Sequence, residues 1–409
     1  MRPLPRIAST LLVAAVTVGT AGTWSAAGQT SPVADPQADH ASDPAAASAV
    51  YTSGTEGYDT FRIPAIIRAP GGDLLAFAEG RRDGGGDSGD IDLVLKRSAD
   101  DGATWSDLTV VGDNGPNTFG NPSPVVDPET GRVVLLSTHN GGDVTETEIR
   151  AGEVEEPDSR RVWVQHSEDD GRTWTEPREI TEDVKLPGWR WYATGPVHAI
   201  ALREGPHAGR LVVPANHSSS PPEGSTDVGT EDKYYDAHLI YSDDGGLTWS
   251  IGALEPTPDG VVNGNESTVA ELPGGRLYVN TRNQNGTAPG NRAAAYSSDG
   301  GASFDGPLQP VPAVIAPVVQ GSLLQVQDGP LLLAAPGSPN RRERLTVRSS
   351  ADEGETWSDG AVLSEAPAAY SDLVALTADE VGVYYETGVD STYETISFQR
   401  LSVSAAAQG

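Results

Sequence analysis

The residues of this chain that could do chemistry are mainly arginines, carboxylates and one tyrosine. They flank short apolar segments, and they are Arg62, Arg81, Asp87, Asp90, Glu266, Arg282, Arg341, Arg342, Arg344 and Tyr370. Guanidinium groups make charge-assisted, often bidentate hydrogen bonds to carboxylates, and they keep their charge at any working pH. Carboxylates exchange protons, and a phenol becomes a nucleophile when a neighbouring base accepts its proton. Such a set suits chemistry on an anionic substrate.

The segments that carry these residues predict six β-hairpins. Each consists of two apolar runs joined by a turn rich in Gly, Pro or Asp, a pattern typical of antiparallel strand pairs. The hairpins are expected at 65–80, 123–139, 198–217, 267–283, 322–338 and 372–388. The reactive side chains stand where the chain enters or leaves a hairpin, at the end opposite to its turn.

An octet of the form Ser-x-Asp-x-Gly-x-Thr-Trp separates successive hairpins. It occurs at 98–105, 167–174, 242–249 and 350–357, with a weaker copy at 297–304. The Asp can accept hydrogen bonds from amides of its own turn, the Gly supplies a positive φ, and the Trp can pack between neighbouring strands. The alternative is that these acids bind a ligand or a metal. Regular recurrence favours a role in the scaffold, because a catalytic motif normally occurs once.

Four strands per unit, repeated six times, predict an all-β fold. The expected architecture is a six-bladed β-propeller of four-stranded antiparallel blades over residues 49–405. In a propeller the open ends of the hairpins gather around one axis and form a ring on one face. That ring would bring the reactive side chains together from distant parts of the sequence.

The N-terminal region predicts export. Arg2 and Arg6 precede an uncharged apolar run from Ile7 to about Ala21, and small residues follow, so 1–27 is interpreted as a signal peptide. Residues 28–48 lack periodicity and are interpreted as a disordered linker. The mature protein is therefore expected to be secreted and extracellular, with no membrane span.

Composition restricts the possible functions. The chain has 409 residues, 37% of them hydrophobic, with 47 Gly and 31 Pro, as expected for a large all-β domain with many turns. Cysteine is absent, which excludes thiol nucleophiles and Cys-ligated metals. The formal net charge of −31 would repel nucleic acid and anionic membranes. The seven histidines show no metal-ligand spacing, so neither a metal nor another cofactor is expected.

The sequence resembles the bacterial exo-sialidases, or neuraminidases, which are propellers with Asp-box (BNR) repeats. Besides the five octets, the matching motifs are FRIP at 61–64, NESTVAEL at 265–272, LYVNTRN at 277–283, QGSLL at 320–324 and AAYSDL at 368–373. The resemblance implies a secreted exo-α-sialidase that hydrolyses terminal α-linked sialic acid with retention of configuration. Its partners would be sialylated glycans of glycoproteins, glycolipids or oligosaccharides, and it would act as a monomer.

The resemblance also implies roles for particular residues. Arg62, Arg282 and Arg342 would bind the carboxylate of sialic acid, Tyr370 would be the nucleophile and Glu266 its base. Among the neighbouring arginines, Arg342 has the family's gap before Leu345 and stands 28 residues before Tyr370. A neutral phenol suits this substrate, because sialic acid carries a carboxylate on its anomeric carbon that would repel an anionic nucleophile.

Asp87 would be the general acid and base, chosen among the acids of the Gly-rich loop that also holds Asp83, Asp90 and Asp92. The family places this acid ten residues before the Arg that closes the next strand, here Arg97. An alternative is that the loop binds calcium, since clustered Asp and Gly are typical of such loops. Arg81 is a possible further substrate contact.

Other positions at the hairpin ends are expected to shape pockets for the glycerol and N-acetyl groups. They are Asn121, His139, Asn140, Tyr192, His198 and His217. Three rival functions stay open: a trans-sialidase, a non-catalytic propeller that binds sialoglycans, and an Asp-box glycosidase for neutral glycans. The binding protein would need only the arginines, and the neutral-glycan enzyme would not need them.

Overall fold

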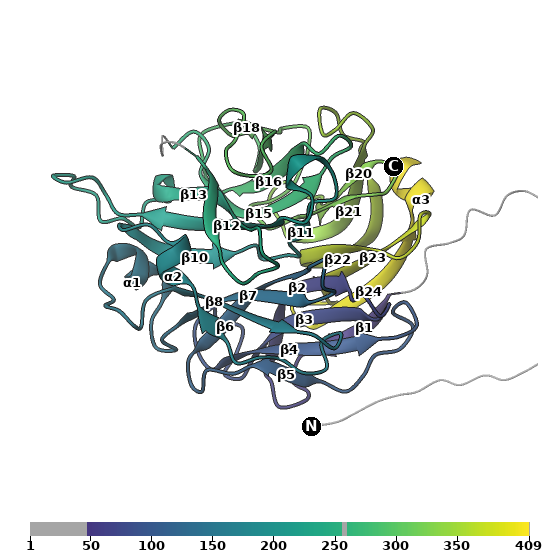
Figure 1. Cartoon of the computed structure of the whole chain (residues 1–409), viewed down its shortest axis with the longest axis horizontal. Coiled ribbons are helices and arrows are strands. Elements are labelled where there is room, and N and C mark those ends of the chain that lie inside the picture. Colours follow the sequence, from purple (N-terminus) through teal and green to yellow (C-terminus); the bar gives the residue numbers. More distant parts are fainter. Residues whose placement is uncertain (1–46, 256–259, 409) are drawn as a thin grey trace, which may run out of the picture. The chain divides into compact units, whose positions relative to one another are not determined.

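Antiparallel strands are the main regular structure of the described part of the chain, and turns and loops connect them (Figure 1). The computed structural model describes residues 47–255 and 260–408. The predicted signal peptide and nearly all of the predicted linker lie outside the described residues. Strand β1 (Ser48–Thr52) begins one residue before the predicted start of the propeller.

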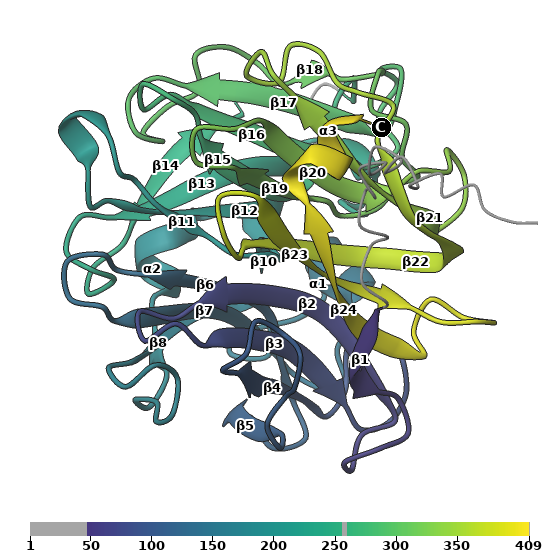
Figure 2. The same ribbon diagram turned by 90° about the vertical axis from the view of Figure 1, so that its right-hand side faces the viewer.

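The first strands form two consecutive antiparallel groups. The first group contains β2 (Thr60–Arg68), β3 (Leu74–Arg81), β4 (Ile91–Ser98) and β5 (Thr109–Gly112). The second contains β6 (Thr118–Val126), β7 (Val133–Asn140), β8 (Arg161–Ser167) and β9 (Arg178–Glu179). One parallel pair between β4 and β6 joins them into an eight-stranded sheet. Strands β2, β3, β4 and β5 lie side by side in that order (Figure 2).

The next two groups are separate sheets. One contains β10 (Trp189–Thr194), β11 (Ile200–Ala201), β12 (Leu211–Ser219), β13 (Tyr235–Ser242) and β14 (Ser250–Leu254). The other contains β15 (Gly264–Glu271), β16 (Leu277–Asn283), β17 (Arg292–Ser297) and β18 (Gln309–Pro310). In the second of these sheets the pairing follows chain order, as expected for hairpins in succession. In the first, both β10 and β11 pair with β12.

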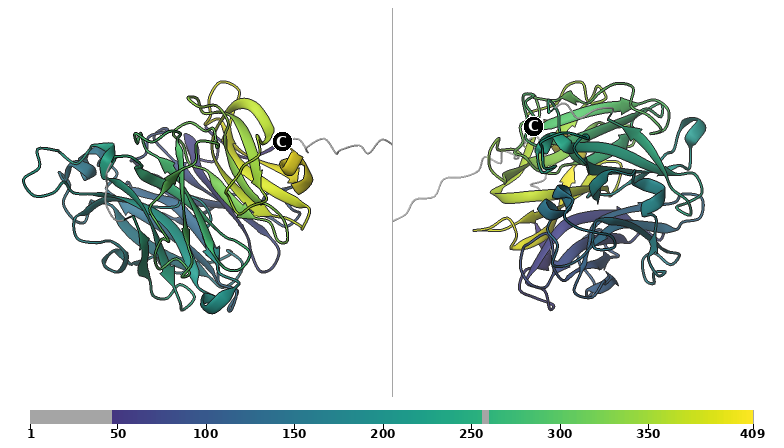
Figure 3. Two further views of the ribbon diagram at one scale, coloured as in Figure 1. Left: turned by 90° about the horizontal axis from the view of Figure 1, so that it is seen from above. Right: turned by 90° about the vertical axis from the view of Figure 1, so that its left-hand side faces the viewer.

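The last sheet joins the two ends of the described chain. It contains β19 (Ser322–Gln325), β20 (Leu331–Pro336), β21 (Glu343–Ser350), β22 (Ala361–Ala375), β23 (Glu380–Thr387) and β24 (Thr395–Ser402). The long strand β22 pairs with β21 through its first half and with β23 through its second. Strand β1 completes the sheet beside β24, so that the yellow C-terminal strands lie against the purple first ones (Figure 3).

These pairings confirm an antiparallel all-β fold. The number of blades stays a prediction, because two of the four sheets run through two predicted units each. Among the described residues, three short α-helices lie between or after strands: α1 (Glu146–Ala151), α2 (Thr181–Val184) and α3 (Val403–Gln408). Two 3-10 helices, η1 (Gly205–His207) and η2 (Asp232–Tyr234), lie in the connections before β12 and β13. Helix α3 buries Ala406, so ordered structure continues beyond the predicted limit at 405.

The core lies between neighbouring sheets. Val134 and Leu136 of β7, for example, pack in one cluster with Val213 of β12 and Ile240 of β13. Strands β2, β3 and β7 are buried over almost their whole length, on both faces. Strands covered on both faces read as nearly continuous apolar runs, which explains the apolar runs of the hairpins.

The octets are part of the scaffold, as predicted. In the second octet, Asp169 accepts hydrogen bonds from the backbone amide of Thr173 at 2.8 Å and from its hydroxyl at 2.7 Å. Gly171 has φ of 77°, which favours glycine, and Trp174 donates back to its carbonyl at 3.2 Å. The same carboxylate contacts recur in the other four octets. The tryptophans differ in burial: Trp249 is 4% exposed, whereas Trp174 is only half-buried.

Candidate active site

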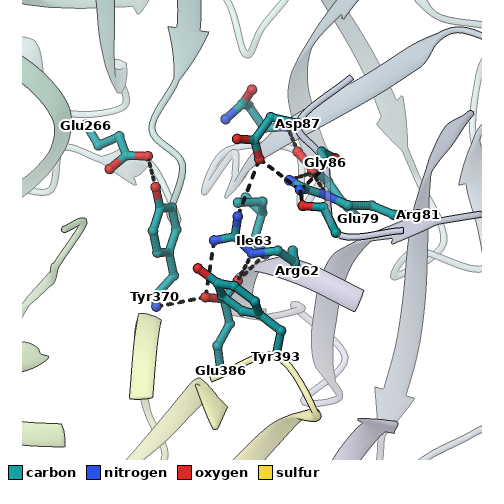
Figure 4. Close-up of polar contacts among 12 residues, drawn as sticks. Arg62, Ile63, Glu79, Arg81, Gly86, Asp87, Glu266, Tyr370, Glu386 and Tyr393 are labelled. Carbon is teal, nitrogen blue, oxygen red and sulfur yellow. Dashed lines mark hydrogen bonds and ion pairs between the residues drawn. The ribbon is translucent and has the colours of Figure 1, made fainter. Parts of the chain in front are cut away.

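All seven residues predicted for the site line one cavity of about 190 Å³, which brings together side chains from distant strands and loops. They are Arg62, Arg81, Asp87, Glu266, Arg282, Arg342 and Tyr370. Figure 4 shows Tyr370 and Glu266 on one side of this group and Asp87 with Arg81 on the other.

Five of the strands that carry cavity residues contain a β-bulge. These strands are β2, β6, β10, β15 and β22, and each has one residue more than its partner strand at the bulge. Asn121, Trp191, Glu266 and Tyr370 lie within four of these bulges, and Arg62 is the last paired residue before the bulge of β2. All five line the cavity. Because a bulge breaks the alternation of side chains, it turns a residue toward the cavity that a regular strand would direct elsewhere.

Tyr370 and Glu266 are directly hydrogen-bonded. The Tyr370 hydroxyl donates to Oε1 of Glu266, and Oε2 of Glu266 accepts from Nη1 of Arg282 at 2.8 Å. Burial, reinforced by the charge of Glu266, raises the pKa of Tyr370 above its ordinary value, although the arginines act in the opposite direction. The phenol is therefore neutral at physiological pH, and Glu266 is placed to accept its proton.

Glu386 fixes Arg62 and Tyr370 with respect to each other. Its carboxylate accepts from Nε of Arg62 at 3.1 Å and from Nη2 at 3.3 Å. It also accepts from the backbone amides of Ile63 at 2.9 Å and of Tyr370 at 3.0 Å. Strands β2 and β22 are thus joined by one buried carboxylate. Sequence reasoning missed Glu386, although it lies at the exit of the sixth predicted hairpin, where reactive residues were sought.

Of the three neighbouring arginines, Arg342 alone lines the cavity within the described residues. Arg341 is exposed and pairs with Glu343 at 3.0 Å, and the exposed Arg344 pairs with Glu365 at 3.5 Å. The choice of Arg342 from the sequence agrees with this placement.

Asp87 faces two of the cavity's arginines. Its carboxylate accepts from Nη1 of Arg81 at 2.8 Å and from Nη1 of Arg62 at 3.4 Å, while the side chain stays 68% exposed. Partial burial acts to raise the pKa of Asp87, but the charges of Arg81 and Arg62 outweigh it, so the pKa lies below its ordinary value. Arg81 is in turn held by Glu79 at 2.6 Å.

Two other acids of the Asp87 loop, Asp90 and Asp92, have partners that do not line the cavity. Asp90 pairs with Arg82 at 3.1 Å, and Asp92 binds the Tyr58 hydroxyl at 2.7 Å. Over the described residues, no group of three or more His, Asp or Glu is arranged to hold a metal ion.

Most residues expected to shape the outer pockets do not line the cavity. Asn121 does so, whereas His139, Asn140, Tyr192, His198 and His217 do not, and the prediction for these five is wrong. For Tyr192 and His217, the preceding residues Trp191 and Asn216 line it instead. Successive side chains of a strand point to opposite faces, so an error of one residue selects the wrong face. His198 binds the buried carboxylate of Asp372 at 2.7 Å, away from the site.

The cavity is also lined by residues that were not predicted from the sequence, namely Glu146, Arg160, Trp191, Asn216 and Tyr235. The guanidinium of buried Arg160 lies 4.1 Å from the centre of the Trp191 ring and donates to the side-chain oxygen of Asn121. Burial lowers the pKa of Arg160 to about 10. Tyr235 donates to Glu146, which α1 carries into the cavity. Both polar atoms of the Asn216 side chain lack a hydrogen-bond partner among the described residues.

The fold and the site together define an antiparallel all-β protein with a cavity lined by arginines, carboxylates and a tyrosine. Residues 72–383 match the BNR repeat-like domain family. The chain is 32% identical over 356 residues to a sialidase of Micromonospora viridifaciens, covering 83% of this chain and 52% of that protein. It is 30% identical over 381 residues to an exo-alpha-sialidase of Aspergillus fumigatus, covering 85% of each.

Two solved structures have a similar fold. A Hadza microbial sialidase superposes with a TM-score of 0.74 and 26% identity, covering 88% of this chain and 69% of that one. A leech intramolecular trans-sialidase has the same fold, with a TM-score of 0.71, 18% identity and coverage of 89% and 71%. The chain belongs to the sialidase family. It spans about half the length of the Micromonospora relative.

Proposed function

We propose that this protein is an exo-α-sialidase that removes terminal α-linked sialic acid from glycoconjugates with retention of configuration. One observation carries the proposal: the Tyr370 hydroxyl is hydrogen-bonded to Glu266 inside a cavity lined by Arg62, Arg282 and Arg342. A nucleophile paired with its base is suited to covalent catalysis, and three guanidiniums are suited to a carboxylate.

Substrate binding begins at the three arginines. The carboxylate of sialic acid is attracted to them although the chain has a net charge of −31, because charges within a cavity are less screened than those on the surface. This contact sets the anomeric carbon near Tyr370, since the carboxylate is attached to that carbon.

The first chemical step forms a bond between the Tyr370 oxygen and the anomeric carbon. The phenolic proton passes to Glu266, the bond to the glycosidic oxygen breaks, and that oxygen takes a proton from Asp87. In the second step, Asp87 accepts a proton from water as the water oxygen attacks the anomeric carbon. Tyr370 leaves and recovers its proton from Glu266. Two inversions give net retention.

Asp87 must carry a proton in the first step, whereas the arginines favour its ionised form in the free site. The substrate carboxylate changes this electrostatic balance. When it binds Arg62, its negative charge offsets the charge that lowers the pKa of Asp87, so binding favours the protonated acid. Substrate and general acid are thereby coupled through Arg62, which contacts Asp87 at 3.4 Å.

The trans-sialidase alternative uses the same groups, with an acceptor sugar in place of water. The binding-protein alternative leaves Tyr370, Glu266 and Asp87 without a purpose.

Secretion, a monomeric state and the choice among sialylated glycans remain predictions. Over the residues that the structure describes, no helix is long and apolar enough to cross a membrane.

The decisive test is to trap the covalent intermediate. The protein is incubated with a 3-fluorinated sialosyl fluoride, digested, and analysed by peptide mass spectrometry. We expect the adduct on the peptide that contains Tyr370, and NMR of natural substrate turnover should show the α anomer of sialic acid first. An adduct on another residue, or the β anomer as first product, would contradict the mechanism.

A further inference from the structure

Tyr393 contacts two of the three arginines that line the cavity. It lies in the segment between β23 and β24, and its hydroxyl accepts a hydrogen bond from Nη1 of Arg342 at 2.8 Å. The guanidinium of Arg62 lies 4.2 Å from the centre of the Tyr393 ring. Figure 4 shows the Tyr393 ring beside Arg62 and Glu386.

The backbone of Tyr393 is anchored independently of the arginines. Its carbonyl accepts from the Ser53 hydroxyl at 2.7 Å, and the Ser53 amide donates to the carbonyl of Glu394 at 3.0 Å. The carboxylate of Glu394 accepts from three successive backbone amides, those of Val389, Asp390 and Ser391, at 2.8 to 3.0 Å. The segment is therefore held in shape by its own hydrogen bonds, which fixes the position from which Tyr393 reaches the arginines.

The three arginines differ in how their charges are balanced. Arg62 pairs with Glu386 at 3.1 Å and Arg282 with Glu266 at 2.8 Å. Within the described residues Arg342 has no carboxylate within ion-pair distance, and its hydrogen-bond acceptors are the Tyr393 hydroxyl and the Val318 carbonyl at 3.5 Å. A neutral hydroxyl orients a guanidinium without cancelling its charge. Arg342 thus keeps the least compensated positive charge of the three, available to an incoming carboxylate.

We propose that Tyr393 is a positioning residue for substrate binding, in addition to the seven residues assigned above. Its hydroxyl sets the direction of the Arg342 guanidinium, and its ring supports Arg62 through a cation–π contact. A flexible arginine loses rotamer entropy when it binds a carboxylate, and an arginine already fixed loses less. The inference rests on the proposed function, because its benefit appears when an anionic sugar binds.

The test compares Tyr393→Phe, which removes the hydroxyl and keeps the ring, with Tyr393→Leu, which removes both contacts. The matched control is Tyr296→Phe. Tyr296 also combines an arginine at its ring with a hydrogen-bonded hydroxyl, and it does not line the cavity. Arg276 lies 4.2 Å from its ring centre, and its hydroxyl donates to the Glu353 carbonyl at 2.9 Å, whereas the Tyr393 hydroxyl accepts from Arg342. Each variant is assayed on a fluorogenic α-sialoside for KM and kcat, and its melting temperature is recorded.

We expect Tyr393→Phe to raise KM about five- to tenfold and Tyr393→Leu to raise it further, both with kcat within about twofold of wild type. Inhibition by free sialic acid should weaken by the same factor, and Tyr296→Phe should leave both constants unchanged. Ser53→Ala, which loosens the anchor without touching the cavity, should raise KM about twofold or more.

An unchanged KM in Tyr393→Phe would overturn the proposal. A fall in kcat at constant KM would also overturn it, since the hydroxyl would then act in the chemical step. If Tyr393→Phe melted much lower than wild type, the Ser53→Ala result would decide: an unchanged KM there rejects the positioning role. Inactivity of the wild-type protein on every α-sialoside would instead contradict the proposed function, which keeps the two failures distinguishable.

Discussion

The hydroxyl of Tyr370 and the carboxylate of Glu266 are hydrogen-bonded across the cavity, from strands in two different sheets. Glu266 is also held by Arg282 at 2.8 Å, so it cannot turn away from the phenol without losing an ion pair. Arg282 Nη1 lies 3.4 Å from the Tyr370 oxygen as well. As the phenol loses its proton, the developing negative charge on that oxygen is therefore next to a fixed positive charge.

The first prediction concerns this pair. Tyr370→Phe keeps the ring but removes the attacking oxygen, so turnover should fall by orders of magnitude while the protein still binds sialic acid through its arginines. Glu266→Gln should also be impaired, because an amide cannot accept the phenolic proton. The double variant should be little worse than the more damaged single one, since both groups serve one step. Steady-state kinetics and sialic acid binding by calorimetry are the measurements.

Full activity in Tyr370→Phe would remove the nucleophile assignment and revive the sialoglycan-binding alternative. Losses that multiply in the double variant would show that the two residues act in separate steps. Tyr278→Phe provides a control, because Tyr278 is buried in another cluster and does not line the cavity.

A second prediction concerns Asn216, whose side chain is buried at 1% exposure and has no partner for either polar atom among the described residues. An unpaired buried amide costs free energy in the unliganded protein. Asn216→Leu should therefore leave the free energy of unfolding unchanged or raise it, while KM for sialosides rises because a hydrogen-bonding contact is lost. Urea unfolding measures the change in the free energy of unfolding, and steady-state kinetics measures the change in KM. A destabilised variant with normal KM would show that Asn216 is structural.

Much of the site could be predicted from the sequence, because each assigned residue stands at the open end of a hairpin within a motif. The hairpin pattern recurs along the sequence, and residues at the open ends of different hairpins line the same cavity. Glu266 and Tyr370 also lie in the bulges of their strands, where an added residue fixes the direction of the side chain, and Arg62 is the paired residue before such a bulge. Motif and geometry point to the same residues.

Two of the errors arise where adjacent residues had to be distinguished. Tyr192 and His217 were expected near the substrate, but Trp191 and Asn216 line the cavity. Choosing between neighbours on a strand requires the register, and the bulge between Trp189 and Tyr192 shifts it without any glycine or proline to indicate the shift. Glu146 and Arg160 come from the connection between β7 and β8, which has no periodic pattern to place its side chains.

A third prediction concerns the octets. Trp249 is 4% exposed and donates to the carbonyl of Gly246 at 3.0 Å, so Trp249→Ala should lower the free energy of unfolding by about 3–5 kcal/mol. Half-buried Trp174 contributes less buried area, and Trp174→Ala should cost less. Neither tryptophan lines the cavity, so kcat of the folded fraction should stay near wild type. Chemical denaturation with activity measurements checks this, and normal stability with lost turnover would implicate an octet in catalysis.

The last prediction concerns stability in acid. His217 and His238 are buried side by side, with their Nδ1 atoms 3.1 Å apart, and His217 stacks on Trp189 with ring centres 3.5 Å apart. Burial lowers the pKa of His217 well below its ordinary value, and the neighbouring His238 and Lys185 act in the same direction. Burial lowers the pKa of His238 to about 3. Both rings are therefore neutral in the folded protein at pH 5.

In the unfolded chain both histidines would take up protons near their ordinary pKa of about 6.5. The unfolded state then binds more protons than the folded state, so the free energy of unfolding falls as pH drops from about 6.5 toward 3. Each such histidine costs about 2 kcal/mol by pH 5, at about 1.4 kcal/mol per pH unit. His198 acts in the opposite direction: burial lowers its pKa, but Asp372 raises it more, so its stabilisation is present below about pH 6.5 and is lost as pH rises through its folded pKa.

Urea unfolding between pH 7.5 and 5 tests the two opposite effects, the loss of stability in acid from His217 and His238 and the gain from His198. We expect wild-type stability to fall with acidification, and His238→Asn, which keeps a polar nitrogen near the position of Nδ1, to give a shallower slope. His198→Asn should be less stable throughout and give a steeper slope, because the opposing contribution is lost. The two variants differ in the sign of their effect on the slope, which a general loss of packing would not produce. Equal slopes in all three proteins would show that these buried histidines do not control the response to acid.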